Sequence, residues 1–226
     1  MTREEVLKRI EDVGVVAAIR VNSREDALFA GAAVGRGGIP VIEIPMTLDG
    51  APEVISQLRE QNPQIIVGAG SVLNAKATQI CLDAGAQFLT SDGLHLARVE
   101  LGVRKGAVIF PGALTPTEVV TAWESGCDFV KVVPCAQIGG EAYIRSVHAM
   151  YPDIPLIAAG GVNQQTASKY ISAGAVALGI GRELIPEDAI RHRQEQRIHE
   201  LTRRFVGFVK SAREGKLPER EGRFMG

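Results

Sequence analysis

The sequence predicts an α/β fold, a (β/α)8 TIM barrel in a single domain with an extra C-terminal helix. Short apolar runs rich in β-branched residues recur at intervals of roughly 20 to 26 residues, and a helical pattern lies between successive runs. The runs are almost continuously apolar, as expected for parallel strands buried on both faces. Regular alternation of such strands with helices is typical of a closed parallel barrel.

Eight runs are candidate strands, at residues 15–19, 41–44, 65–67, 87–90, 107–110, 129–133, 156–158 and 176–178. The alternative for such a pattern is an open, doubly wound sheet. That fold usually carries a Gly-x-Gly-x-x-Gly motif after its first strand, whereas this chain reads Ile19-Arg-Val-Asn-Ser23 there. The sequence therefore favours the barrel.

Polar residues that can cap a helix follow several of the strands. Ser23, Asn74 and Asn163 each stand before a helical pattern, and Thr115 is followed three residues later by Glu118, as in a capping box. These signals predict where helices begin and support the alternation of strand and helix.

The domain organisation is simple. With 226 residues, 46% of them hydrophobic, the chain is long enough for one complete barrel core. We expect one domain over residues 1–226, with the barrel at about 12–190. A charged amphipathic segment after the last strand predicts a C-terminal helix and tail at 191–226.

Composition and charge exclude several classes of partner. The formal net charge of −1 argues against nucleic acid or an anionic membrane as the main partner. The start of the chain is charged and the longest apolar runs are too short to span a bilayer, so we expect a cytoplasmic protein. The three cysteines form no Cys-x-x-Cys pair, and no ligand cluster calls for a metal or cofactor.

Lys131 is the most informative residue, because it interrupts the apolar run 129–133 with a charge. Burial favours the neutral form of a lysine, and a neutral amine can attack a carbonyl to form a Schiff base. Glu43 interrupts the run 41–44 in the same way, and period-2 alternation turns both side chains toward the barrel interior. The alternative is a buried Glu43–Lys131 ion pair with a purely structural role.

The residues that follow the strands define the catalytic rim of a barrel. They are Arg20, Thr47, Gly68-Ala-Gly-Ser71, Ser91-Asp-Gly93, Pro111-Gly112, Pro134-Cys135, Gly160-Gly161 and Gly179-Ile-Gly-Arg182. Glycines after the seventh and eighth strands predict exposed backbone N–H groups at helix N-termini, where phosphates bind in this fold. Arg20 can pair with a carboxylate or phosphate, although a simple salt bridge at the rim is equally consistent with the sequence.

Several segments together resemble a known family over roughly residues 4–190. They include Val15-Val-Ala-Ala-Ile-Arg20, Ile42-Glu-Ile-Pro-Met-Thr47, Gly68-Ala-Gly-Ser-Val-Leu73, Gly85-Ala-Gln-Phe88, Pro111-Gly-Ala-Leu-Thr-Pro-Thr-Glu118, Phe129-Val-Lys-Val-Val-Pro134 and Gly160-Gly-Val-Asn163. In these the chain resembles the class I bacterial aldolases that act on 2-keto-3-deoxy-6-phosphogluconate and 4-hydroxy-2-oxoglutarate.

The resemblance implies a lyase that needs no cofactor, releases pyruvate and an aldehyde, and acts in carbohydrate metabolism, in the Entner–Doudoroff pathway. It implies Lys131 as the Schiff-base lysine and Glu43 as the general acid and base, in a homotrimer. From their places at the rim, we expect a substrate-binding set made of Arg20, Thr47, Gly160, Gly161, Gly181 and Arg182.

Four departures from the family pattern concern the substrate. Many members have arginine where Thr47 stands, although others carry threonine there. The chain has Ala158-Ala-Gly-Gly161 where the family usually has Pro-Thr-Gly-Gly, so Ala159 lacks the hydroxyl that helps hold the 2-oxo acid. Arg182 stands where a serine is common, and Asp92 replaces a proline. The changes at Ala159 and Arg182 leave open a Schiff-base decarboxylase of oxaloacetate. Two alternatives do not use Lys131 as a nucleophile: a metal-free isomerase or epimerase of a phosphorylated sugar, and a non-catalytic barrel that binds an anion.

Overall fold

The computed structural model describes residues 1–215 and confirms the predicted barrel. Its strands are all parallel and follow the order β5-β4-β3-β2-β1-β9-β8-β7-β6. They are β1 Val15–Ala18, β2 Val41–Pro45, β3 Ile66–Gly70, β4 Phe88–Thr90, β5 Val108–Phe110, β6 Gly112–Ala113, β7 Val130–Val132, β8 Leu156–Ala159 and β9 Ala175–Ile180. Only Pro111 separates β5 from β6, so these two segments form one barrel strand that continues the ring from β4 to β7.

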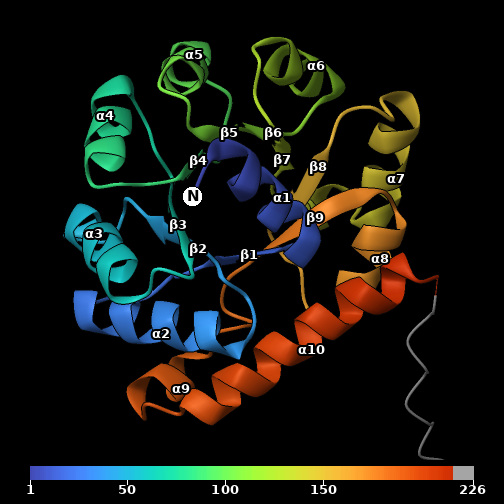
Figure 1. The fold of residues 1–226 in the computed structure, drawn as a ribbon. Helices are drawn as coiled ribbons and strands as arrows, with labels where there is room; N and C mark the ends of the chain where they lie inside the picture. The colour runs from blue at the N-terminus through green and yellow to red at the C-terminus, as the bar shows by residue number, and fades with distance from the viewer. Residues whose placement is uncertain (216–226) are drawn as a thin grey trace, which may run out of the picture.

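The helices surround the strands (Figure 1). They are α1 Arg3–Val13, α2 Arg24–Gly37, α3 Ala51–Gln61, α4 Ala75–Asp83, α5 Leu96–Arg104, α6 Pro116–Glu124, the 3-10 turn η1 Ala136–Ile138, α7 Glu141–Met150, α8 Ala167–Ser172, α9 Glu187–Arg191 and α10 Glu195–Arg213. Each of the eight predicted strands overlaps an observed one. The alternation that predicts the barrel is therefore present at every step.

Three of the four predicted helix starts are confirmed. Ser23 Oγ accepts a hydrogen bond from the Asp26 amide at 3.1 Å, and Asn74 Oδ1 accepts one from the Ala77 amide at 2.9 Å. Thr115 forms a complete capping box with Glu118. Asn163 differs, because its side chain accepts from the amides of residues 165 and 166 and so closes a turn that precedes α8.

Helix α1 lies across the N-terminal end of the barrel (Figure 1). Its Val6 and Ile10 join an inner core cluster that includes Phe88, Phe110 and Phe129. The Phe88 and Phe110 rings stack with centroids 5.1 Å apart, while those of Phe110 and Phe129 meet edge to face at 5.9 Å. Apolar side chains therefore fill the lower part of the barrel and leave only its C-terminal end for polar chemistry.

The C-terminal segment forms the predicted helix. Helix α10 packs on α2 and α8 and buries Ile198, Thr202, Phe205 and Val209. The end of α2 comes so close to α10 that a Cβ on Gly37 would lie 2.1 Å from Thr202 Oγ1. The expected tail lies in part outside the described residues.

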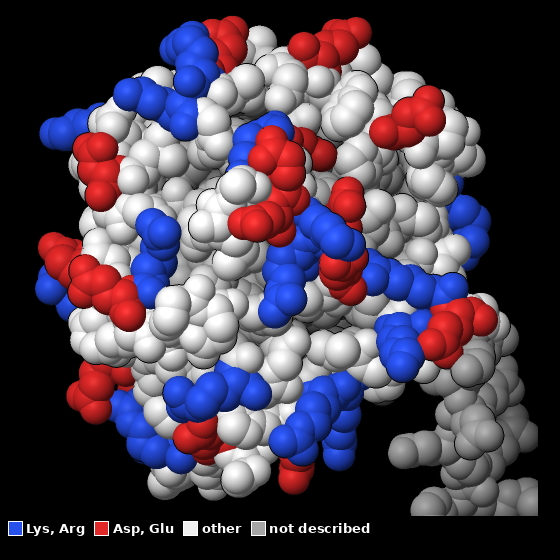
Figure 2. Space-filling view, viewed as in Figure 1, with Lys and Arg blue, Asp and Glu red and all other residues white. Residues whose placement is uncertain are grey.

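On the face seen in Figure 2, acidic and basic groups are mixed and no continuous patch of one sign appears. Within residues 1–215, no helix has the length and apolar character needed to cross a membrane.

Candidate active site

Lys131 is buried in the middle of β7, with an exposed fraction of 4%. The strand alternates as predicted: Phe129 belongs to the inner core cluster, while Val130 packs in the outer cluster between strands and helices. Lys131 Nζ donates to Asp92 Oδ1 at 2.9 Å and to Thr90 Oγ1 at 3.2 Å. The amine therefore sits inside the barrel within a defined set of polar partners.

Glu43 occupies the corresponding place on β2 and is also 4% exposed. Its Oε2 accepts a hydrogen bond from Thr90 Oγ1 at 2.9 Å. Thr90 thus lies between Glu43 and Lys131, and Lys131 forms its ion pair with Asp92 instead. Among residues 1–215, a direct Glu43–Lys131 ion pair, the structural alternative for these two residues, is absent.

Gly70 at the end of β3 makes room for the Glu43 carboxylate. A Cβ at this position would lie 2.2 Å from Glu43 Oε1. The other carboxylate oxygen is held by Thr90, so the carboxylate has one anchored and one open oxygen. Among residues 1–215, no donor contacts Oε1, and Glu43 lines the pocket described below. A carboxylate that is joined to an amine through one hydroxyl and keeps one oxygen open is suited to accepting and returning protons.

Asp92 lies in the loop after β4 and its side chain is about half exposed, at 49%. Ser71 Oγ donates to its Oδ2 at 2.9 Å, while Lys131 Nζ donates to Oδ1. Partial burial raises the pKa of Asp92, but the charge of Lys131, its hydrogen bond and that of Ser71 outweigh this effect and lower the pKa overall. Asp92 is therefore a firmly ionised carboxylate with both oxygens engaged.

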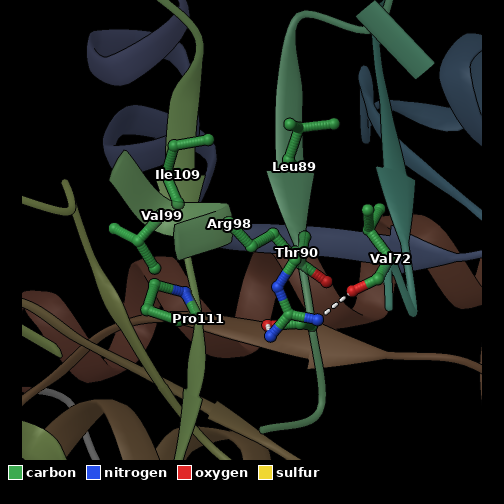
Figure 3. Close-up of a pocket in the computed structure, with 8 residues that line it drawn as sticks. Val72, Leu89, Thr90, Arg98, Val99, Ile109 and Pro111 are labelled. Carbon is green, nitrogen blue, oxygen red and sulfur yellow. Dashed lines mark hydrogen bonds between the residues drawn. The ribbon is translucent and has the colours of Figure 1, made fainter. Parts of the chain in front are cut away.

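Arg98 of α5 fixes the loops that carry Ser71 and Asp92. Its guanidinium donates to Ser91 Oγ at 3.0 Å, to the Gly93 carbonyl at 2.7 Å and to the Val72 carbonyl. Figure 3 shows this side chain reaching past Thr90 toward Val72, beside a small cavity of about 10 Å³. Burial lowers the pKa of Arg98, although the negative charge of Asp92 opposes this shift.

A pocket of about 430 Å³ opens above Lys131 and Glu43 at the C-terminal end of the barrel. Five predicted substrate-binding residues line it, namely Arg20, Gly160, Gly161, Gly181 and Arg182. Asp92, Ala159 and Glu183 also line it. A second pocket of about 520 Å³ shares Arg20 and Arg182 with the first, so the two arginines stand between the pockets.

Thr47 is the exception among the predicted binding residues. It is exposed and is not among the residues that line the pocket. The chain turns directly after β2, where the Leu48 amide donates to the Pro45 carbonyl at 3.0 Å. This turn takes Thr47 out of line with the strand and away from the pocket.

The glycine loops also differ from expectation. Gly160 and Gly161 have φ angles of +83° and +87°, and a Cβ on Gly160 would lie 2.7 Å from Pro134 Cα. They permit close approach of the loop after β7 rather than starting a helix, since α8 begins only at Ala167. Likewise α9 begins at Glu187, well after Gly181. The predicted position of these glycines at helix N-termini is wrong.

Lys131, Glu43, Thr90 and Asp92 form one hydrogen-bonded cluster, the polar centre of the barrel. Sequence reasoning did not assign two of these residues to it. Thr90 is the last residue of an apolar strand and carries no charge to mark it. Asp92 is visible as a polar residue after the fourth strand, but nothing in the sequence assigns it to Lys131. Among residues 1–215, no group of three His, Cys, Asp or Glu side chains is placed to hold a metal ion.

Comparison with known proteins identifies the family. The family model for KDPG and KHG aldolase matches residues 6–201. The chain is 29% identical to the 2-dehydro-3-deoxy-phosphogluconate aldolase of Pseudoalteromonas atlantica, over 85% of this chain and 89% of that protein. It is 28% identical to the 2-dehydro-3-deoxy-6-phosphogalactonate aldolase of Escherichia coli, over 88% of this chain and 95% of that protein.

A solved structure agrees with these relatives. The chain superposes with a TM-score of 0.81, at 25% identity, on KDPG aldolase from Legionella pneumophila, whose structure holds pyruvate captured at low pH as a covalent carbinolamine intermediate. The match covers 87% of this chain and 95% of that one. Since the family model spans most of the barrel, the chain belongs to the KDPG and KHG aldolase family.

Proposed function

We propose that the chain cleaves a 6-phosphorylated 2-keto-3-deoxy sugar acid, or the related 4-hydroxy-2-oxoglutarate, to pyruvate and an aldehyde. The reaction class, that of a class I aldolase and therefore a lyase, follows from membership of the family. The observation that carries the proposal is Lys131, buried below a 430 Å³ pocket that is also lined by three carboxylates and two arginines.

Lys131 is the proposed nucleophile. Its neutral amine attacks the C2 carbonyl of the 2-oxo acid, and loss of water from the resulting carbinolamine gives an iminium. The iminium accepts the electron pair released when the C3–C4 bond breaks, which leaves an enamine of pyruvate on Lys131. Protonation of this enamine and hydrolysis release pyruvate and restore the lysine.

Glu43 is the proposed proton carrier. The chain of hydrogen bonds from Lys131 Nζ through Thr90 Oγ1 to Glu43 Oε2 provides a route for the amine proton. Glu43 lines the pocket, and its Oε1 has no donor among residues 1–215, so this oxygen can take the proton of the C4 hydroxyl and later return one to the enamine. Thr90 is a positioning residue in this scheme, since it acts through the two groups that it joins.

Arg20 and Arg182 are the proposed anion-binding groups. Both line the pocket over Lys131 and the neighbouring pocket. A guanidinium can bind a phosphate or carboxylate through paired hydrogen bonds. Gly160, Gly161 and Gly181 are proposed to admit the substrate backbone at this wall, whereas the exposed Thr47 has no part in the proposed site.

A direct assay of pyruvate release tests the substrate. We expect the purified protein to prefer the phosphorylated sugar acid to its unphosphorylated analogue by about 10- to 100-fold in kcat/KM, because charge-assisted hydrogen bonds contribute about 1.5–3 kcal/mol. Gluconate- and galactonate-derived substrates, 4-hydroxy-2-oxoglutarate and oxaloacetate are compared under the same conditions. Faster release from oxaloacetate than from every aldol substrate would instead identify a decarboxylase.

Thr90→Val tests the proton route. Valine has nearly the shape of threonine but no hydroxyl, so it separates Glu43 from Lys131 while Asp92 still holds the amine. We expect kcat to fall about 10- to 100-fold with little change in KM, below the range of full general acid–base catalysis. Thr90→Ser is the matched control and should keep most of the activity. Equal losses in both variants would show that packing of the methyl group, rather than the hydroxyl, matters.

Oligomeric state and location are further parts of the proposal. We propose a homotrimer that uses an apolar surface formed by Leu73, Ile80, Leu96 and Val103, all of which are exposed by 38% or more. Helices α4 and α5, which carry three of these residues, contact each other. Burial of such a patch between subunits is a common reason for its presence. A cytoplasmic location fits an enzyme of central carbohydrate metabolism, such as the Entner–Doudoroff pathway.

A further inference from the structure

The polar centre holds a second carboxylate for which the proposed reaction has no role so far. Asp92 contacts the reacting nitrogen directly, at 2.9 Å, whereas Glu43 reaches it only through Thr90. The Asp92 side chain is half exposed and lines the pocket, so a molecule in the pocket can contact it while it binds Lys131. Because it contacts the reacting nitrogen, Asp92 can take part directly in the chemistry of Lys131.

The position of Asp92 is fixed from several sides. Ser71 holds the second carboxylate oxygen, and Ser71 itself adopts a left-handed backbone with φ of +52°. Gly112 lets the loop approach closely, since a Cβ there would lie 2.4 Å from the Asp92 carbonyl carbon. Arg98 binds the residues on both sides of Asp92. Strained and over-determined backbone of this kind is typical of functional sites.

The proposed reaction keeps a positive charge on the Lys131 nitrogen, which a neighbouring anion can compensate. An ammonium and a ketone combine to give an iminium and one water, so the nitrogen carries one positive charge before and after condensation. The Nζ–C2 bond forms and the C2–O bond breaks. Two of the three Nζ protons leave with the oxygen as water, and the third stays on the iminium nitrogen. A fixed anion beside the nitrogen therefore compensates the charge in both states.

We propose that Asp92 is a catalytic residue, the permanent counterion of the Lys131 nitrogen as ammonium and as iminium, while Glu43 moves the protons. This division of roles rests on the proposed Schiff-base function. A permanent counterion should be fixed in place, whereas a proton carrier needs an oxygen that is free to bind a proton, and the two carboxylates differ in this respect. Both oxygens of Asp92 are engaged, by Lys131 and Ser71, whereas Glu43 lines the pocket and its Oε1 has no donor among residues 1–215.

Other charged groups lie around the Lys131 nitrogen, and the experiment must distinguish their effects from that of Asp92. Glu43 acts on the nitrogen from β2 through Thr90, and Arg20, Arg182 and Glu183 line the pocket above it. Arg98 lies behind Asp92 and interacts with its charge. Glu183 provides a matched control, because Glu183→Gln also removes one negative charge from the pocket wall without touching Lys131.

The test measures the reactivity of Lys131 without substrate. The full-length protein is acetylated with acetic anhydride across a range of pH, and modification of Lys131 is followed by peptide mass mapping. Asp92 favours the ammonium, so Asp92→Asn should let the proton leave at lower pH. Because Asp92 is half exposed, we expect the midpoint to move down by about 1 pH unit, the low end of the range for a neighbouring opposite charge.

Two outcomes overturn the inference: an unchanged midpoint in Asp92→Asn, or an equal shift in Glu183→Gln. Asp92→Ala replaces Asp92→Asn if the latter does not purify as a folded protein, and the same shift is expected. Borohydride trapping with pyruvate on the same samples separates this result from the proposed function. At a pH above both midpoints, where the amine is neutral in both proteins, the adduct should form about tenfold more slowly in Asp92→Asn, because its iminium lacks the counterion. If the wild type gains no reduced pyruvyl group in this trapping experiment, the Schiff-base function is overturned, whatever the acetylation midpoints show.

Discussion

Lys131→Met removes turnover and the site of covalent attachment together. Without an amine in β7 the 2-oxo acid has no nucleophile and the breaking bond has no electron sink, so we expect a loss of more than about 10⁴-fold in kcat. The decisive measurement treats the protein with pyruvate and borohydride and reads the product by intact mass and peptide mapping. The wild type should gain one reduced pyruvyl group on Lys131, and the variant should gain none.

The variant should remain folded, because methionine fills a similar volume and the Asp92 carboxylate left behind is half exposed to solvent. Circular dichroism and thermal unfolding check this. Lys169→Met is the matched control: Lys169 is an exposed lysine on α8, and its loss should leave both adduct and turnover unchanged. Full activity in Lys131→Met, or an adduct on another lysine, would contradict the proposed nucleophile.

The sequence predicted the two central residues because strand geometry alone places them. In a parallel strand buried on both faces, alternation decides which side chains face the barrel interior, and a lone charge there is conspicuous. Val41 and Phe129 do lie in the inner core, two residues before Glu43 and Lys131 respectively. The barrel follows from the same pattern, since eight apolar runs separated by helices leave few other topologies.

The contacts between these residues could not be predicted in the same way. Which side chains stand at the same height depends on the stagger between neighbouring strands, seen here in the pairing of Gly112 with Lys131. The direct partner of Lys131 comes from a loop, whose course depends on the buried Arg98 and on the room that Gly112 leaves. The same dependence on local turns explains why Thr47, although directly beyond β2, lies outside the pocket.

Glu43→Gln should separate carbon–nitrogen chemistry from proton transfer. Glutamine has the same shape, and its amide oxygen can still accept the hydrogen bond from Thr90, but it cannot carry a proton. We expect kcat for cleavage to fall by about 10²- to 10⁴-fold. The reduced pyruvyl adduct on Lys131 should still form, more slowly, since the nucleophile and the Asp92 carboxylate remain.

Exchange of the pyruvate methyl protons with deuterated water isolates the step assigned to Glu43. This exchange requires the iminium to lose and regain a proton at C3, with no aldehyde involved. The wild type should exchange the methyl protons and form the reduced adduct. Glu43→Gln should form the adduct but exchange the protons very slowly, and Lys131→Met should do neither. Rapid exchange in Glu43→Gln would transfer the proton-carrying role to another group. Asp92 is the nearest carboxylate to the reacting nitrogen, so Asp92→Asn combined with Glu43→Gln would then show whether the two carboxylates share one role or hold two.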